Sequence, residues 1–285
     1  MPPAQLDVGT LAHDQCVRRR LFLAGLVVLC YNHLLTLDEE ITYIWTPKLK
    51  RSSIWFLLVR YFALAGNFAL IPYFLGDLDV QTCQKLSTVQ NCLLLIQETF
   101  VETTLATRVL AMYGFNRRVF AALGVVAVIT IGLGVFSVTG PNTSISTTLS
   151  GCHMPTSHGM AIRMAAAWEA QLVCDILIVC LTMHRACSYQ AHGGIRMHSI
   201  LGIMVRDGAL YFGMIGLVVA VNIMGLYLIS AGSLAWFAST ISVTMVCRLM
   251  LNLHGAAHRD WEESDSAMQL GTTSATADGQ PEDAP

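Results

Sequence analysis

The sequence predicts an all-α polytopic membrane protein, a bundle of seven transmembrane helices with its N-terminus outside and its C-terminus inside. The first observation is composition: 54% of the 285 residues are hydrophobic and only 13% are charged, whereas a soluble domain carries about 25% charged residues. The second is that no Asp, Glu, Lys or Arg lies between Arg118 and Arg163, or between Asp207 and Arg248. The third is the distribution of basic residues between the two sides.

Apolar runs give the elements in order. A spanning helix needs about 20 mostly apolar residues, and the second charge-free stretch holds two of them, with a hinge at residues 230–233. The predicted spans are Leu21–Leu37, Ile54–Leu75, Leu86–Tyr113, Val119–Val138, Met160–Met183, Ala209–Ile229 and Ser233–Leu253.

Two segments flank this transmembrane domain of residues 21–255. Residues 1–20 form a short N-terminal segment. Residues 256–285 are expected to be a disordered acidic tail, because from Asp260 onward they carry seven acidic residues and no Lys or Arg.

Short loops set the orientation, because cytoplasmic loops carry an excess of Lys and Arg. With the N-terminus outside, eight basic residues fall on the inner side and five on the outer side. The triple arginine Arg18–Arg20 argues the other way, so the bias is modest. Asn142 begins an Asn-Thr-Ser glycosylation sequon in the loop after the fourth span, which favours the same orientation.

Cys83 and Cys152 would then both lie outside, in an oxidising compartment. Cys83 precedes the third span and Cys152 lies in the loop that bears the sequon. A disulfide between them is expected, and two unpaired cysteines are the alternative.

The third span carries ionisable residues at helical spacing. Asn91, Glu98 and Glu102 are seven and four residues apart, so they share one face. An ionised side chain at the bilayer centre costs about 2.5–3.5 kcal/mol on insertion scales. Glu98, Glu102 and Asp175 of the fifth span are therefore expected to face the interior and to lie together, with at least one protonated. Their expected hydrogen-bond donors are Asn67, Tyr211 and Asn222.

The basic residues near the inner ends of the spans are expected to play a different role from the acids. Arg60, Arg108, Arg206 and Arg248 are expected to act mainly as interface anchors, or to pair with the acidic run Asp38–Glu40. The acid cluster itself is equally consistent with structural glue and with a ligand or ion site.

The first two spans carry a distinctive pattern. Tyr31 is followed by Leu34-Leu35-Thr36-Leu37-Asp38, then by Trp45, a basic loop and the stretch Phe56–Tyr61, which includes Arg60 and Tyr61. This pattern resembles a family of fungal membrane proteins, known mainly from basidiomycetes, that is described only as domain of unknown function 6533. Further matches over residues 20–255 are looser and include Arg108, Asp207, Gly208 and Arg248. The resemblance implies a seven-span membrane protein and supplies no catalytic residue.

Three function classes follow from these observations. A receptor-like sensor fits the seven spans, the disulfide and Arg108. However, Thr107 rather than an acid precedes Arg108, and the last three spans contain no Pro. A transporter or channel for a small solute or ion would use the intramembrane carboxylates. An intramembrane enzyme has no motif in its support, so the chain is not expected to be an enzyme.

No cofactor or metal site is expected. The lysines are Lys48, Lys50 and Lys85, so no Schiff-base lysine exists in the last span, and the histidines match no zinc pattern. The expected partners are the lipid bilayer, a small-molecule ligand and a cytosolic protein. Nucleic acid is excluded because there is no basic patch, and the expected location is the plasma membrane or another membrane of the secretory pathway.

Overall fold

The computed structural model describes residues 8–46, 50–139, 152, 158–191, 200–229 and 234–277. These residues form helices and no strands. The elements are α1 (Val8–Leu35), α2 (Leu37–Glu40), the π-helical turn η1 (Ile41–Trp45), α3 (Arg51–Ala69), α4 (Ile71–Leu75), α5 (Val80–Met112), α6 (Arg117–Val138), α7 (His158–Ala191), α8 (Ile200–Ile229) and α9 (Ala235–Ala277). A helix lies over each of the seven predicted spans.

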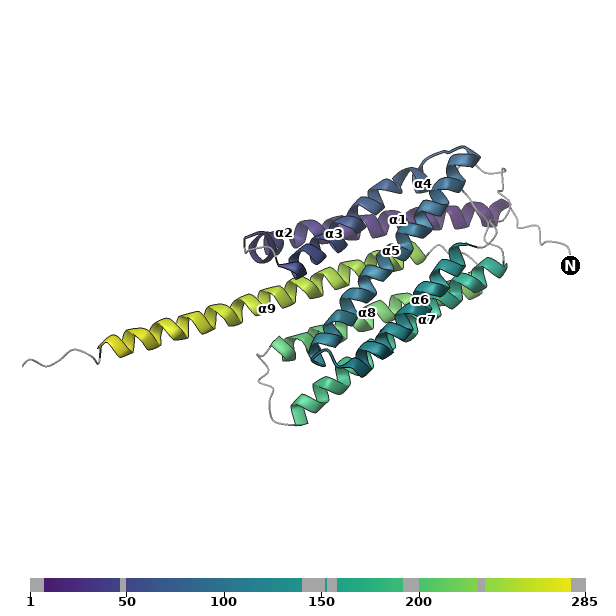
Figure 1. The fold of residues 1–285 in the computed structure, drawn as a ribbon. Coiled ribbons are helices and arrows are strands. Elements are labelled where there is room, and N and C mark those ends of the chain that lie inside the picture. The colour runs from purple at the N-terminus through teal and green to yellow at the C-terminus, as the bar shows by residue number, and fades with distance from the viewer. Residues whose placement is uncertain are drawn as a thin grey trace, which may run out of the picture.

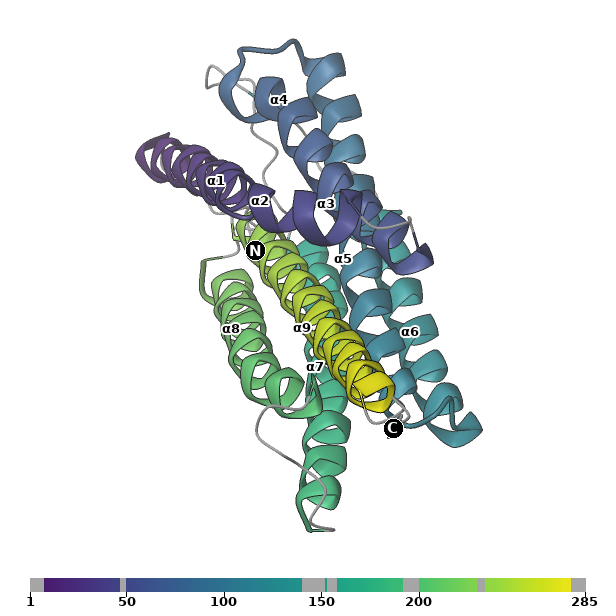
Figure 2. The ribbon, with the colours of Figure 1, turned by 90° about the vertical axis from the view of Figure 1, so that its left-hand side faces the viewer.

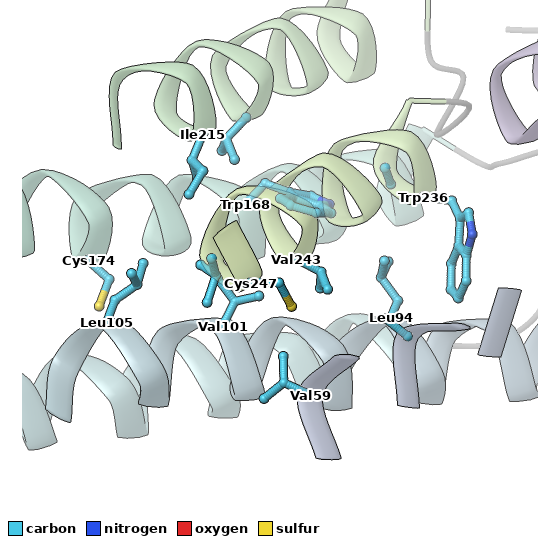
Figure 3. Packing of buried hydrophobic residues seen from close by; sticks show 14 of the residues in the cluster. Val59, Leu94, Val101, Leu105, Trp168, Cys174, Ile215, Trp236, Val243 and Cys247 are labelled. Carbon is cyan, nitrogen blue, oxygen red and sulfur yellow. The ribbon is translucent and has the colours of Figure 1, made fainter. Parts of the chain in front are cut away.

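Helix α9 is the centre of the bundle, and α6 is at its rim. Figures 1 and 2 show α9 running between the other helices, and it packs against α1, α3, α5 and α8. In their most apolar windows 67% of α9 is buried but only 17% of α6. The hydrophobic core therefore lies around α9, where Val59, Val101, Ile215, Val243 and Cys247 meet from four helices (Figure 3).

Four helical segments are long and apolar enough to cross a membrane, namely Arg51–Leu75, Arg117–Val138, Ala161–Arg185 and Ala235–Arg259. Gln15–Leu35 and Leu37–Trp45 would make a fifth span, bent by 54°. α5 has 33 residues, but its polar side chains lower its hydropathy. α8 has 30 residues, and the part of it whose side chains are described is the apolar stretch Gly213–Tyr227. The chain is thus a helical, membrane-type protein, with four or five candidate spans among its described residues.

The bend after α1 begins at Thr36. The hydroxyl of Thr36 donates to the Asn32 carbonyl oxygen at 2.8 Å, and such back-bonding often bends helices. A second break, between α3 and α4, comes two residues before Pro72, which has no N–H to donate.

A tight turn joins α5 to α6. Gly114 and Phe115 follow the end of α5 in the left-handed region, with φ of 60° and 57°, a conformation common just after a helix C-terminus. The Asn116 side chain then caps α6 by accepting from the Arg118 backbone N–H at 2.9 Å. α5 and α6 consequently run antiparallel along one side of the bundle (Figure 1).

Both predicted flanking segments differ from expectation. α1 begins at Val8, so part of the N-terminal segment extends the first helix, and Arg18 donates to the Tyr73 hydroxyl at 3.4 Å. α9 continues to Ala277, so residues 256–277 are helical where a disordered tail was predicted. The packed part of α9 supplies the helix nucleus, and each further residue then adds a hydrogen bond at little cost.

Candidate functional site

Three acidic side chains lie inside the bundle. Glu98 and Glu102 of α5 are 9% and 5% exposed, and Asp175 of α7 is 4% exposed. Asp175 interacts electrostatically with both glutamates. The structure therefore brings together the three acids that helical spacing and the cost of charge in hydrocarbon had placed there. We call these three residues the carboxylate cluster.

The carboxylate cluster has few hydrogen-bond donors. The Ser239 hydroxyl of α9 lies beside Glu98 and the Cys174 thiol beside Glu102. Within the described part of the chain, one oxygen of each glutamate and both oxygens of Asp175 have no hydrogen-bond partner. A buried polar group without a partner is costly, so this cluster is poorly explained as structural glue alone.

Two of the three predicted donors, Asn67 and Asn222, do not supply the missing bonds. Asn67 was expected at the cluster, but its amide oxygen accepts from the Trp236 indole at 2.9 Å and its amide nitrogen donates to the Ala63 carbonyl oxygen at 2.9 Å. This expectation was wrong because the buried face of α3 at Asn67 packs on the start of α9. Asn222 is buried with neither amide atom hydrogen-bonded in the described residues. Tyr211 lies on α8, whose side chains are described only over Gly213–Tyr227.

Two cavities between α5, α6 and α7 end at the cluster. The first, of about 70 Å³, includes Asn91, Glu98, Ser137 and Trp168 in its lining, and we call it the Glu98 cavity. The second, of about 210 Å³, includes Glu102, Leu110, Phe120 and Leu123, and we call it the Glu102 cavity. They follow one another along the same groove.

The two cavities together cover a distance close to the thickness of a membrane core. Their lining on α5 runs from Asn91 to Leu110, and at about 1.5 Å per residue this is roughly 29 Å. A bilayer's hydrocarbon core is about 30 Å thick. Glu98 and Glu102 lie in the middle of this length, and one of these two glutamates lines each cavity.

A second polar centre joins α1, α2 and α3. The Arg60 guanidinium forms an ion pair with Glu40 at 2.9 Å, with the two side chains 3% and 0% exposed. Arg60 also donates to the Thr36 hydroxyl at 2.8 Å and to the His33 ring at 3.0 Å. Of the two roles expected for Arg60, the structure shows pairing with the acidic run and not an interface anchor, because the bend after α1 brings Glu40 directly against it.

Two aromatic donors complete this centre. The Trp45 indole and the Tyr61 hydroxyl each donate to Glu40 at 3.0 Å. We call Glu40, Arg60, His33, Thr36 and their aromatic donors the Arg60 clamp. The sequence offered the acidic run Asp38–Glu40 as a partner for Arg60, but it did not indicate that Glu40 is the acid involved or that His33 and Thr36 also accept from Arg60.

The family-type pattern divides between two faces of α1. Thr36 belongs to the clamp, and Asn32 accepts a hydrogen bond from Arg248 of α9. The apolar members Tyr31, Leu34, Leu35 and Leu37 are 37–71% exposed, and Asp38 is exposed as well. In a bilayer these apolar side chains would face lipid, so the pattern combines a lipid-facing surface with a buried polar seam.

The remaining predicted residues take other places. Cys83 and Cys152 form a disulfide-distance pair with Cα atoms 5.5 Å apart, as predicted. Arg108 donates to the Leu249 carbonyl oxygen at 3.4 Å. The sequon at Asn142 lies outside the described residues, as do the side chains of Asp207 and Arg206 and the surroundings of Gly208.

Comparison with known proteins gives a match in the region that forms the Arg60 clamp. Residues 21–65 match a family of unknown function (DUF6533). No curated protein matches the chain. The matched residues contain every side chain of the Arg60 clamp and none of the carboxylate cluster. The residues that match the family therefore include those that form the bend after α1 and those that pack this bend on α3.

Proposed function

We propose that the chain is a seven-helix integral membrane protein with its N-terminus outside and its C-terminus inside. A helix over every predicted span, the basic bias and the paired cysteines support this topology. Because the disulfide needs an oxidising compartment, the protein belongs to the plasma membrane or another secretory-pathway membrane. The fungal family membership over residues 20–255 is part of the same proposal, supported by the match over residues 21–65.

A protease-protection experiment tests the topology. A tag placed after Asp265 should stay protected in intact cells and be digested once the membrane is permeabilised. A matched tag fused ahead of Met1 should show the reverse. Digestion of the C-terminal tag from outside intact cells would refute the proposed orientation.

The function proposed for this protein is transport of a small cationic solute or of protons. The observation that carries the proposal is that two cavities end on either side of one pair of buried carboxylates, Glu98 and Glu102. Central binding between two separate approaches is the arrangement that alternating access requires. The cluster has unpartnered oxygens and its recorded neighbours are a hydroxyl, a thiol and other acids, so a cation or a proton is the complementary occupant.

A receptor-like sensor is the second candidate. The observation in its favour is that the Cys83–Cys152 pair ties the start of α5 to the segment that follows α6, which would stabilise a ligand pocket at that end. The Glu98 cavity approaches from this end but holds only about 70 Å³, whereas small-molecule pockets usually measure about 300–1,000 Å³. An enzymatic role is not proposed, since no catalytic motif supports it.

Flux measurements on the reconstituted full chain distinguish these candidates. Liposomes loaded with a pH-sensitive dye would report proton movement under an imposed potential, and radiolabelled methylammonium would report movement of a small cation. Glu98→Gln should abolish the flux while leaving expression intact, because Gln keeps the size and loses the charge. Glu169→Gln is the matched control, since Glu169 is an exposed α7 carboxylate that accepts from Tyr227 at 2.6 Å. If neither probe moves, or if Glu98→Gln leaves the flux unchanged, transport is refuted.

A further inference from the structure

The α6 wall of the Glu102 cavity is apolar, and the α5 wall carries Glu102 and the three threonines Thr99, Thr103 and Thr107. Its lining includes Leu110, Phe120, Leu123 and Ile131, with the Glu102 carboxylate among them. Its volume of about 210 Å³ corresponds to about seven water molecules at liquid density. An apolar cavity holds water poorly, so its shape and chemistry suit a compact organic molecule better than a water chain.

The Glu102 carboxylate indicates that the bound molecule carries positive charge. The side chain is 5% exposed, and one of its oxygens has no hydrogen-bond partner among the described residues. A carboxylate accepts hydrogen bonds, and those from a cationic donor are about twice as strong as neutral ones. A carboxylate at the wall of an otherwise uncharged cavity is complementary to an N–H donor that carries positive charge.

A metal ion fits this wall less well than an ammonium group does. Mg²⁺ and Ca²⁺ require six or more oxygen ligands, and the described residues contain no group of three His, Cys, Asp or Glu able to hold a metal ion. Glu102 lies beside the Cys174 thiol and interacts with the other two acids of the carboxylate cluster, and the α6 wall of the cavity is hydrocarbon. One ammonium group and one carboxylate complete each other without further ligands.

The mouth of the cavity indicates the route of entry. Thr103, Phe120 and Ile131 line the cavity and are also exposed at the surface of α5 and α6. In a bilayer this part of the surface faces acyl chains. A molecule that reaches Glu102 through this mouth must partition into lipid, which selects an amine with an apolar body.

We propose that the Glu102 cavity binds a small apolar amine, with its ammonium group on Glu102 and its apolar body against Leu110, Phe120 and Leu123. This inference rests on the proposed function and names its substrate class. The apolar body would lie within the cavity between α5 and α6. Glu98 and Asp175 would then be free to exchange protons with the opposite approach.

Binding to the full chain in lipid nanodiscs tests the proposal, with 2-phenylethylamine as the probe and 2-phenylethanol as its uncharged counterpart. The amine should bind saturably and the alcohol should bind much more weakly. Glu102→Gln should weaken amine binding about 10- to 150-fold, which corresponds to the loss of one hydrogen bond to a charged group. Glu169→Gln should leave the binding unchanged.

Two glycine variants test the proposal independently of whether Glu102→Gln folds correctly. Gly124 lines the cavity, and a Cβ added there would meet nothing within 4 Å, so Gly124→Leu should fill the space and remove amine binding with Glu102 intact. Gly132 is an exposed glycine of the same helix that also has open space around it and lines neither cavity. Gly132→Leu should bind the amine normally.

Each result has a defined meaning. Equal binding of the amine and the alcohol, or amine binding that survives both Glu102→Gln and Gly124→Leu, would overturn the inference. If the amine fails to bind while methylammonium or proton flux still depends on Glu98, the inference fails and transport stands. If the amine binds at Glu102 but no flux occurs, the inference stands and transport fails.

Discussion

Removal of the Arg60 side chain should destabilise the protein more than removal of any exposed arginine side chain. In Arg60→Met the Glu40 carboxylate, which is fully buried, loses its ion-pair partner at 2.9 Å. Breaking a buried pair from one side costs about 3–5 kcal/mol, because an uncompensated charge stays inside. The hydrogen bonds to Thr36 and His33 are lost as well, so we expect a loss of about 4 kcal/mol in the free energy of unfolding.

The double variant Arg60→Met/Glu40→Met gives the sharper test. Replacing a whole buried pair by apolar side chains is often neutral or stabilising. The Trp45 and Tyr61 donors that would lose Glu40 are themselves 51% and 39% exposed, so water or lipid headgroups can replace their acceptor. The double variant should therefore be more stable than Arg60→Met alone.

Reversible unfolding in mixed detergent micelles, followed by circular dichroism, measures these free energies. Arg51→Met is the matched control, since Arg51 lies on the same helix and is exposed, and it should change stability by less than about 0.5 kcal/mol. The reasoning is refuted if Arg60→Met costs no more than Arg51→Met, or if the costs of Arg60→Met and Glu40→Met simply add in the double variant.

Two further predictions concern the start of α5. Cys83→Ser should lower stability by about 4 kcal/mol in the chain-entropy model, because the bond to Cys152 spans 69 residues. The exposed free Cys92 provides the control: thiol labelling under non-reducing conditions should gain one site, Cys152, in Cys83→Ser and should lose one site in Cys92→Ser. Asp79 caps α5, and hydrogen bonds from the Thr82 hydroxyl and backbone hold the pKa of its carboxyl below 3.8. Because the folded-state pKa is depressed, the stabilisation should be present above about pH 4 and lost as the pH falls through the folded pKa. Asp79→Asn, which keeps the cap without the charge, should abolish this pH dependence; an unchanged acid transition would contradict the argument.

Local information was enough for the helices and for the burial of the acids. Apolar runs specify helices in lipid because only intrahelical hydrogen bonds satisfy the backbone there. Glu98 and Glu102 are four residues apart on one helix face, and an unpaired carboxylate facing hydrocarbon is costly. The positions of these two side chains therefore followed from spacing and solvation alone.

Local information was not enough for the partners. Asp38, Glu39 and Glu40 are adjacent acids, and only the bend after α1 determines that Glu40 is the one buried against Arg60. Asn67 bonds to Trp236, 169 residues away, which no local pattern indicates. The helical extension of α9 to Ala277 was also missed, since composition describes a free chain rather than one continued from a packed helix.

The sequence by itself determined an all-helical membrane chain and its inward-facing carboxylates, because periodicity and the cost of burying charge act within single helices. Only the tertiary structure decided which groups meet and where space remains. The Arg60 clamp arises from a bend, and the Glu98 and Glu102 cavities from the way α5, α6 and α7 pack. Contacts and voids depend on the relative placement of several helices, and that placement is not encoded in the spacing of any one of them.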